Sequence, residues 1–503
     1  MLCAPMPLRR SAARWFATLA LLLAAAALAP SCHRSSSAAP ALELSPCRPK
    51  GVSEEVRCGT LNVPEDRAKP NGRTLGLHVA VVPALSAAPK PDALFILAGG
   101  PGQAAAELIG PVLPLFEKEH RERDIVFVDQ RGTGKSSPLA CEASEDAGLA
   151  ERFSEGIDAP ALHACLDGYR KAGIDVRQYL TPTAMDDLDA VRAALGYDRI
   201  DLWGASYGTR AALVYLRRHP EHVRVAVLDG VYPTDISLLL TAAQDGQRAF
   251  DLIFDACAKD PVCNAKYPAL KKQFTDLLAR LDAEPAHTTV ADPLTGAPTE
   301  LTLTRSSFVE NLHGLLYVPE IGSLLPLIVQ RASHGDFAPF VAQAAGLGGG
   351  IGADLFHGMF FSVLCAEDGP AATPEARARV NTPQTYFGDA FAQQMLQVCA
   401  FWPRGELPKD FHQPVHAKAP VLLLSGALDP ITPPVRGEHA LQTLPHGRHI
   451  VVPGVGHGTT MRGCVADLVD AFIESGTAKG LDAGCVGQLD RPPFFVGFAG
   501  PTP

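Results

Sequence analysis

The ten residues from Asp201 to Arg210 constrain the fold of this chain more than any other stretch. They predict a buried strand, a sharp turn that carries Gly204-x-Ser206-x-Gly208, and the start of a helix. Because glycine lets two backbone segments approach closely, Ser206 is expected at a strained apex with its hydroxyl exposed. The residues that follow Ser206 favour a helix, which Pro220 ends. Ser206 is therefore expected at the N-terminus of this helix, where negative charge is favoured. The turn therefore predicts the nucleophile of an acyl-transfer enzyme, although this motif alone is weak until its context agrees.

Strands that alternate with helices surround this turn. Unbroken apolar runs predict central strands, and residues 60–63 with 74–82 predict an antiparallel pair that opens the sheet. This alternation argues for a parallel, doubly wound sheet. Between 235 and 416 helical patterns dominate instead, which indicates an inserted cap. The expected central strands are 93–97, 124–128, the run into Ser206, 223–228, 421–425 and 449–452, and the expected helices include 104–116, 183–195, 247–258, 266–283, 321–333, 435–444 and 465–474.

Two further loops supply an acid and a base. Asp429 and His457 each come just after a predicted late strand. Because open parallel sheets build their sites at the carboxyl ends of the strands, both side chains are expected beside Ser206. The chain order serine, acid, histidine is that of α/β-hydrolases. Asp229, which follows another predicted strand, is the rival acid, and the alternative for Asp429 and His457 is a plain turn residue.

The assignments define a mechanism. Ser206 attacks a carbonyl, and His457 takes its proton and later gives it to the leaving group. Asp429 holds the imidazole tautomer and stabilises the imidazolium. The oxyanion needs two fixed N–H donors, expected from the backbone of Tyr207 and from Gly100 in the glycine loop after strand 93–97. The expected fold class is an α/β-hydrolase with a doubly wound, mostly parallel sheet and a mainly helical cap, and its chemistry uses no metal and no cofactor.

The N-terminus has the pattern of a targeting segment. Three arginines precede an apolar run at 15–29 that ends in small residues. Because the run is short, it predicts a signal peptide rather than a membrane span. Cys32 stands where a bacterial lipoprotein signal carries its lipidated cysteine, so lipid attachment at Cys32 and simple cleavage both stay open. The protein is therefore expected outside the cytoplasm: in the periplasm, attached to a membrane, or in the medium.

Cysteine usage agrees with export. Ten cysteines follow Cys32, and an even number in an exported chain indicates disulfides. Metal binding is the rival interpretation, but the sequence has no C-x₂-C pair and no His/Cys cluster at ligand spacing. The formal charge of −10 and the lack of a basic stripe argue against a nucleic-acid partner. Clustering along the chain predicts five neighbouring pairs: Cys47–Cys58, Cys141–Cys165, Cys257–Cys263, Cys365–Cys399 and Cys464–Cys485.

Five motifs occur in combination: Gly99-Gly100-Pro101-Gly102, Asp129-Gln130-Arg131-Gly132-x-Gly134-x-Ser136, Gly204-x-Ser206-Tyr207-Gly208, Gly426-x-x-Asp429-Pro430-x-Thr432-Pro433 and Gly456-His457-Gly458. Together they resemble the proline iminopeptidase and tripeptidyl aminopeptidase group of α/β-hydrolases over about residues 55–475. The helical insertion and the exported, cysteine-rich context resemble the secreted tripeptidyl aminopeptidase branch. Ala98 stands where iminopeptidases carry histidine, so the resemblance does not extend to a preference for proline. It implies a serine exopeptidase that releases amino acids or short peptides, tripeptides among them, from free N-termini.

The expected organisation follows from these patterns. A core of two parts flanks the cap, and an exported leader and a tail lie outside it. The expected parts are a signal peptide (1–32), an N-terminal linker (33–54), the first part of the core (55–234), the helical cap (235–416), the second part of the core (417–480) and a C-terminal tail (481–503).

An exopeptidase of this kind needs an anionic anchor, because a free α-amine is cationic at neutral pH and costly to bury unpaired. Related exopeptidases hold the amine with acidic cap residues, and the stretch 360–368 resembles the corresponding segment. The resemblance implies that Glu367 binds the amine, with Asp368 assisting or orienting it. The alternative is that both residues form a solvated turn or cap a helix that starts near Pro374.

Two other functions stay open. An esterase or amidase would use the same machinery on other substrates. A catalytically silent binding lipoprotein would keep only the fold, and failure of Ser206 to react with a fluorophosphonate would favour it. The number of residues released per cut, the side-chain preference, the physiological substrate and the oligomeric state are not determined by the sequence.

Overall fold

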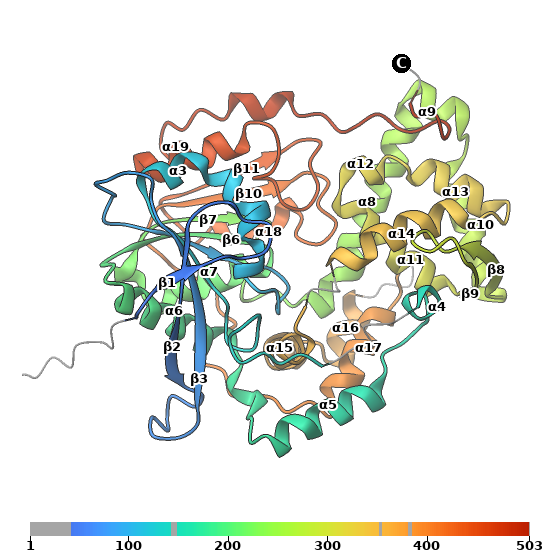
Figure 1. Cartoon of the computed structure of the whole chain (residues 1–503). Coiled ribbons are helices and arrows are strands. Elements are labelled where there is room, and N and C mark those ends of the chain that lie inside the picture. Colours follow the sequence, from blue (N-terminus) through green and yellow to red (C-terminus); the bar gives the residue numbers. More distant parts are fainter. Residues whose placement is uncertain (1–41, 142–147, 352–354, 381–384, 502–503) are drawn as a thin grey trace, which may run out of the picture. The chain divides into compact units, whose positions relative to one another are not determined.

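The computed structural model describes residues 42–141, 148–351, 355–380 and 385–501 (Figure 1). The predicted signal peptide, with Cys32, lies outside the described residues. Within the described part, no helix combines the length and apolar character that a bilayer span requires.

A nine-stranded sheet forms the centre of the core, in the order β1-β2-β3-β5-β4-β6-β7-β10-β11. The first pairs, from β1 through β3 to β5, are antiparallel, and every pair from β5 to β11 is parallel. The predicted mostly parallel sheet is therefore confirmed. The strands are β1 (Ser45–Cys47), β2 (Val56–Pro64), β3 (Thr74–Val82), β4 (Leu94–Leu97), β5 (Ile125–Val128), β6 (Ile200–Ala205), β7 (Val223–Asp229), β10 (Val421–Gly426) and β11 (Gly447–Val452).

Helices cover both faces of the sheet. Alternate side chains of β4 enter different hydrophobic clusters: Phe95 packs with residues of α6 and α7, and Ile96 packs with residues of α19. This alternation is what a strand buried on both faces requires, so the sheet is doubly wound. The helices outside the cap are η2 (Ala106–Leu108), α2 (Ile109–Val112), η3 (Leu113–Phe116), α3 (Glu117–Glu122), α4 (Leu149–Arg152), α5 (Ala159–Lys171), η4 (Val176–Gln178), α6 (Thr181–Leu195), α7 (Tyr207–Arg218), η5 (Pro220–His222), α18 (Pro434–Leu441), α19 (Val465–Ser475) and η9 (Gly484–Gln488).

The segment between β7 and β10 is mainly helical, as expected, and much of it packs around a hydrophobic cluster of its own. Phe153, from the segment before α5, and Phe494, from the tail, join that cluster. The boundaries 235–416 for the cap stay a prediction. Its elements are α8 (Leu238–Lys259), α9 (Pro261–Lys266), α10 (Leu270–Ala283), β8 (Ala286–Ala291), β9 (Pro298–Leu303), α11 (Arg305–Gly314), η6 (Leu315–Tyr317), α12 (Pro319–Gly322), α13 (Leu325–Ser333), α14 (Ala338–Ile351), α15 (His357–Val363), the π-helical turn η7 (Leu364–Asp368), η8 (Gly369–Ala371), α16 (Pro374–Val380) and α17 (Ala390–Cys399).

Local structure differs from the expected elements in several places. The helix expected at 247–258 begins earlier, at Leu238, and the helix expected at 321–333 is two helices, α12 and α13, separated at residues 323–324. The helix expected at 104–116 is three short pieces, because Pro111 and Pro114 lack the N–H that a continuous helix uses. The helix expected at 266–283 begins at Leu270, after Pro268. The antiparallel hairpin β8–β9 was not expected in the cap. Its turn is closed by Asp292, whose carboxylate accepts hydrogen bonds from two following backbone N–H groups.

All five predicted disulfides are present, in the predicted pairing. Two of them lie in the cap, Cys257–Cys263 at the corner between α8 and α9 and Cys365–Cys399 between η7 and α17. Neighbouring cysteines pair because each couple belongs to one local unit of the fold.

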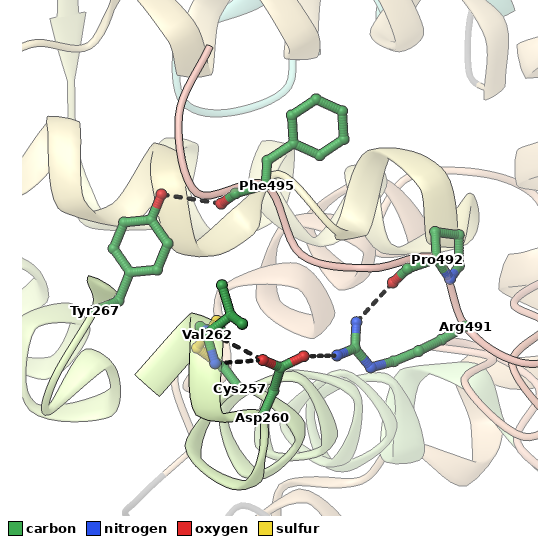
Figure 2. The surroundings of a disulfide bond; sticks show 8 residues. Cys257, Asp260, Val262, Tyr267, Arg491, Pro492 and Phe495 are labelled. Atoms are coloured by element: carbon green, nitrogen blue, oxygen red, sulfur yellow. Dashed lines mark hydrogen bonds and ion pairs between the residues drawn. A yellow bond between two sulfur atoms is a disulfide. The ribbon is translucent and has the colours of Figure 1, made fainter. Parts of the chain in front are cut away.

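The C-terminal tail reaches the cap, as Figure 2 shows beside the Cys257–Cys263 bond. The hydroxyl of Tyr267 donates to the carbonyl of Phe495 at 2.9 Å, and the Arg491 guanidinium lies 3.6 Å from the Asp260 carboxylate. Phe494 is buried among apolar side chains of the cap. Residues 491–495 therefore fasten the end of the chain to α8, α9 and their neighbours.

Candidate active site

The predicted elbow around Ser206 is present between β6 and α7. An added Cβ at Gly208 would lie 2.1 Å from the carbonyl oxygen of Leu97, and one at Gly204 would lie 2.3 Å from that of Gly208. Both positions therefore require glycine, because the start of α7 nearly touches the end of β4 at Gly208 and the end of β6 at Gly204. Ser206 has φ 56° and ψ −123°, a conformation that non-glycine residues rarely adopt. The strain fixes the serine at the N-terminus of α7.

The glycine loop after β4 lies against this serine. An added Cβ at Gly99 would lie 3.5 Å from the Cβ of Ser206, and Gly100 has φ 104°, which favours glycine. Tyr207 is the first residue of α7, where a backbone N–H has no partner within the helix. The structure thus brings the loop and the elbow together, and the oxyanion roles of Gly100 and Tyr207 stay predictions.

Asp429 and His457 form a hydrogen-bonded pair. The Nδ1 atom of His457 lies 2.8 Å from Oδ2 of Asp429. The other carboxylate oxygen accepts from the backbone N–H groups of Ile431 and Thr432, at 2.9 and 2.8 Å, and the Thr432 hydroxyl donates to Oδ2. Asp429 is fully buried, so these four donors replace the water that an ionised carboxylate needs.

The charges of the pair stabilise each other. Burial disfavours the charged form of Asp429, but His457 and the backbone donors outweigh it and hold the pKa of the carboxyl below its usual range. Burial likewise opposes protonation of His457, but the charge and hydrogen bond of Asp429 outweigh it and raise the imidazole pKa above its ordinary value. Asp229 adds a smaller contribution in the same direction. Each group of the pair therefore stabilises the charged form of the other.

Asp229, the rival acid, is engaged elsewhere. Its two carboxylate oxygens accept four hydrogen bonds, from the backbone N–H and the hydroxyl of Thr459 and of Thr460, at 2.7–2.9 Å. These bonds hold the loop that follows His457. The geometry favours Asp429 as the acid, because it is the one that contacts the imidazole.

Ser206 and His457 both lie against the end of β7. The backbone N–H of Ser206 donates to the carbonyl of Asp229 at 2.9 Å. An added Cβ at Gly230, the next residue, would lie 3.2 Å from Cε1 of His457. The nucleophile and the base predicted from strand ends are therefore brought to one place, and their roles stay predictions.

Glu367 and Asp368 lie buried in the π-helical turn η7, so they form no solvated turn. Asp368 pairs with Arg210 of α7 at 3.0 Å and accepts from the Tyr232 hydroxyl at 2.7 Å. Glu367 accepts from the backbone N–H of Thr181 at 2.9 Å, and its Oε2 lies 3.6 Å from the Arg210 guanidinium without a hydrogen bond. Burial raises the pKa of Glu367 to about 7 although Arg210 and Thr181 oppose that shift.

This arrangement links the cap to the elbow. Arg210 is fully buried, stacks on the Tyr232 ring at 3.6 Å and donates to the carbonyls of Pro233 and Ile236. Arg210 follows Ser206 by one helical turn. Asp368 is therefore fully engaged with protein donors, whereas Glu367 keeps one carboxylate oxygen without a hydrogen bond. Amine binding by Glu367 stays a prediction.

Several residues near the site were not expected. Thr432 belongs to the Asp429 motif, and its hydroxyl lies beside the Asp429 carboxylate. Three cap side chains, Arg248, His313 and Tyr317, contact the loops of Asp429 and His457. No periodicity or motif marks these three, because each lies more than a hundred residues from its partner.

Among the described residues, Asp189, His219 and His222 have the spacing of a metal site, with ligand atoms within 4.8 Å of one another. The cluster lies at the far end of α7 from Ser206. Asp189 already accepts from Arg192 and from the Tyr215 hydroxyl. The predicted mechanism does not use this cluster.

Comparisons with known proteins match the motifs. A family described as TAP-like protein matches residues 383–485. Serine protease Hip1 of Mycobacterium tuberculosis is 26% identical over 496 residues, covering 88% of this chain and 91% of that protein. A tripeptidyl aminopeptidase of Streptomyces lividans is 26% identical over 485 residues, covering 86% and 84%. A protein named carboxylesterase B of Mycobacterium tuberculosis is 27% identical over 455 residues, covering 84% and 85%.

The resemblance to the tripeptidyl aminopeptidase group is confirmed by these relatives, and the α/β-hydrolase fold by the sheet together with the family match. Both named peptidases align over most of this chain, so the similarity includes the cap as well as the core. The protein is a hydrolase with the serine-hydrolase architecture.

Proposed function

We propose that this protein is an exported serine exopeptidase that releases amino acids or short peptides, tripeptides among them, from free N-termini. The observation that carries the proposal is the Asp429–His457 pair, which lies at the same strand end as the strained Ser206. Similarity to serine protease Hip1 and to a tripeptidyl aminopeptidase over most of the chain supports peptides as substrates.

In the proposed mechanism, Ser206 attacks the carbonyl of the scissile peptide bond. His457 accepts the serine proton, and then donates it to the amine that leaves, which produces an acyl-enzyme. Asp429 keeps the Nδ1 proton of His457 in place, so that Nε2 is free to act as the base. The N–H groups of Tyr207 and Gly100 stabilise the oxyanion. Water then attacks the acyl-enzyme by the same steps and releases the short product.

The proposed amine anchor is Glu367, with Asp368 orienting it through Arg210. The Oε2 atom of Glu367 supports this role, because it is a carboxylate oxygen that makes no hydrogen bond. A charge-assisted hydrogen bond is worth about 1.5–3 kcal/mol, so Glu367→Gln should lower kcat/KM on free-amine substrates about 10- to 150-fold. Hydrolysis of a small uncharged ester by Ser206 should hardly change.

A matched comparison is available on the cap. Glu310 of α11 is a half-buried carboxylate for which the described residues provide no hydrogen bond or ion pair, and burial raises its pKa to about 7. It lies one helical turn from His313, which contacts the loop of Asp429. If Glu310→Gln lost the preference for a free amine and Glu367→Gln kept it, the amine-binding residue would be Glu310 of α11 instead. Equal loss on amine and ester substrates for Glu367→Gln would make that residue structural.

An esterase or amidase is the second candidate function, and the relative named carboxylesterase B favours it. The fold and the catalytic residues do not decide between the two, because both reactions use the same acyl-enzyme chemistry. The two functions differ in the length of the best substrate and in whether that substrate needs a free amine.

The proposal is tested with a panel of mono-, di- and tripeptidyl anilides, each with a free or an acetylated N-terminus, alongside simple acyl esters. An exopeptidase should prefer one length and the free amine. Faster turnover of the esters than of every anilide would establish the esterase instead. The Ser206→Ala variant serves as the control, and it should lose ~10⁴-fold or more of turnover with the fold intact.

Export is part of the proposal. The five disulfides support it, because structural disulfides persist in oxidising compartments. Cys32, which the structure does not describe, is the proposed lipid attachment site. Mass spectrometry of the mature N-terminus checks this: a diacylated cysteine supports attachment to a membrane, and an unmodified cleaved end supports release.

A further inference from the structure

Cap side chains contact both of the loops that carry Asp429 and His457. Arg248 comes from α8, His313 from α11 and Tyr317 from η6. In an α/β-hydrolase the acid and the base lie on loops of the core, so the core alone is expected to position them. Here the same cap region contacts the acid loop and the base loop at once.

On the acid loop, cap donors bind backbone carbonyls. Arg248 donates through Nη2 to the carbonyl of Ala427 at 2.7 Å and through Nη1 to that of Asp429 at 3.4 Å. The Nε2 atom of His313 lies 3.1 Å from the carbonyl of Pro430. Because a carbonyl only accepts, Nε2 of His313 carries the proton, and burial lowers the pKa of His313, which favours the neutral ring.

A charged contact extends this interface. Asp245 of α8 pairs with Arg436 of α18, the helix that follows the acid loop. The carboxylate of Asp429 meanwhile accepts from His457 and from its own loop. The acid loop is therefore held from two sides: His457 binds its carboxylate, and the cap binds its backbone carbonyls.

On the base loop, the backbone N–H of His457 donates to the carbonyl of Tyr317 at 3.1 Å. The two rings meet edge to face, with centroids 5.1 Å apart and planes at 69°. An added Cβ at Gly456 would lie 2.5 Å from the Tyr317 carbonyl oxygen, so this approach requires glycine. The His313 ring packs edge-on against Tyr317 at 5.9 Å, which joins the two contacts into one unit.

We infer that His313 is a positioning residue, and that it couples the cap to the geometry of the Asp429–His457 hydrogen bond. The inference rests on the proposed catalytic roles of those two residues. His313 binds the carbonyl of the residue after Asp429 and touches the ring that packs on His457. A change in its contact moves the carboxylate relative to the imidazole, and misplacements of about 1 Å cost about 10²-fold in rate.

His313→Phe tests this inference, because phenylalanine keeps the ring and its packing but removes the donor to Pro430. We expect kcat to fall about 10- to 100-fold with KM within about 2-fold, on the free-amine anilide and on a small ester alike. His313→Gln restores an N–H donor and should recover most of the loss. His334→Phe, an exposed histidine of the same cap, is the matched control and should behave as the wild type.

Two readouts separate positioning from a general structural effect. The His457 Nδ1 proton should give a downfield NMR resonance that shifts upfield in His313→Phe and returns in His313→Gln. The acid limb of the kcat/KM profile should move to lower pH in His313→Phe, because a weaker bond to Asp429 stabilises the imidazolium less. The formal charge should stay the same in this variant, because the lowered pKa of His313 favours the neutral ring.

The inference is overturned if His313→Phe keeps kcat within 2-fold, or if KM rises while kcat and the resonance stay unchanged. An equal loss in the phenylalanine and glutamine variants, with an unchanged resonance, also overturns it. These outcomes differ from failure of the proposed function. The ester assay measures catalysis by Ser206, His457 and Asp429 whether or not the enzyme requires a free amine.

Discussion

Replacing Asp429 by asparagine tests the acid assignment with little change in shape. The two backbone N–H groups of Ile431 and Thr432 both point at Oδ1 of Asp429. In the variant, the amide oxygen must occupy that position, since the amide nitrogen there would face two donors. The NH₂ group then faces Nδ1 of His457, which is 2.8 Å from the carboxylate oxygen in the wild type.

The consequence is a change of tautomer at His457. With an amide donor in front of it, Nδ1 must accept, so the ring proton moves to Nε2, the nitrogen that takes the proton of Ser206 in the proposed mechanism. A triad with the wrong tautomer loses about 10⁴-fold in kcat, equivalent to about 5.4 kcal/mol at the transition state. Stability should change little, because the variant satisfies the backbone donors. Steady-state kinetics on a tripeptidyl anilide, with thermal unfolding alongside, measure both effects.

Asp229→Asn is the matched control, and the opposite result is expected. Each carboxylate oxygen of Asp229 accepts one backbone N–H, from Thr459 or Thr460, so either orientation of an amide leaves a buried N–H facing an NH₂ group. An unsatisfied buried donor costs about 1–3 kcal/mol of stability. The activity of Asp229→Asn at low temperature should stay within about ten-fold of the wild-type activity. If Asp429→Asn kept that much activity while Asp229→Asn lost about 10³-fold or more, the acid assignment would be reversed.

Three further outcomes are expected. The kcat/KM of the wild type should fall as pH drops through the pKa of His457, which Asp429 raises, so the acid limb should lie above about 6.5, and a midpoint near 5.5 would contradict this. Replacing Cys365 and Cys399 by serine should lower the free energy of unfolding by about 4 kcal/mol, the chain-entropy value for the 34-residue separation, as measured by denaturant titration. The folded-state pKa of Glu367 is raised to about 7, so its contribution to stability is full below the unfolded pKa of about 4.3 and is lost as pH rises through 7. Glu367→Gln should accordingly gain melting temperature relative to the wild type between pH 5 and 8, and a constant difference across that range would refute the shift.

The positions of the candidate site residues were predictable where local pattern and strand order determine them. Ser206, Asp429 and His457 each follow a strand whose apolar run is visible in the sequence, and a parallel sheet brings strand ends to one edge. The disulfides were predictable for a related reason, because neighbouring cysteines belong to one local unit. Gly204 and Gly208 predicted the sharp turn at Ser206, because such a turn brings backbone segments too close together for any residue but glycine.

The cap was predictable only as a helical insertion. Arg248, His313 and Tyr317 contact loops far along the chain, and helical periodicity states which face is apolar but not which loop it meets. The pairing of Asp368 with Arg210 was hidden for the same reason. Arg210 lies on α7, 158 residues before Asp368 in the chain, so no local pattern connects the two. The hairpin β8–β9 was not predicted, because helical patterns dominate the sequence on both sides of it.

The requirement for a free N-terminus is the central claim, and one comparison tests it most directly. The kcat/KM of the mature protein is measured on one tripeptidyl anilide with its α-amine free and then acetylated, with Ser206→Ala as the blank. An exopeptidase that anchors the ammonium should lose about 10- to 150-fold on acetylation, the value of one charge-assisted hydrogen bond. Equal cleavage of the two substrates, or faster cleavage of the acetylated one, would contradict the claim.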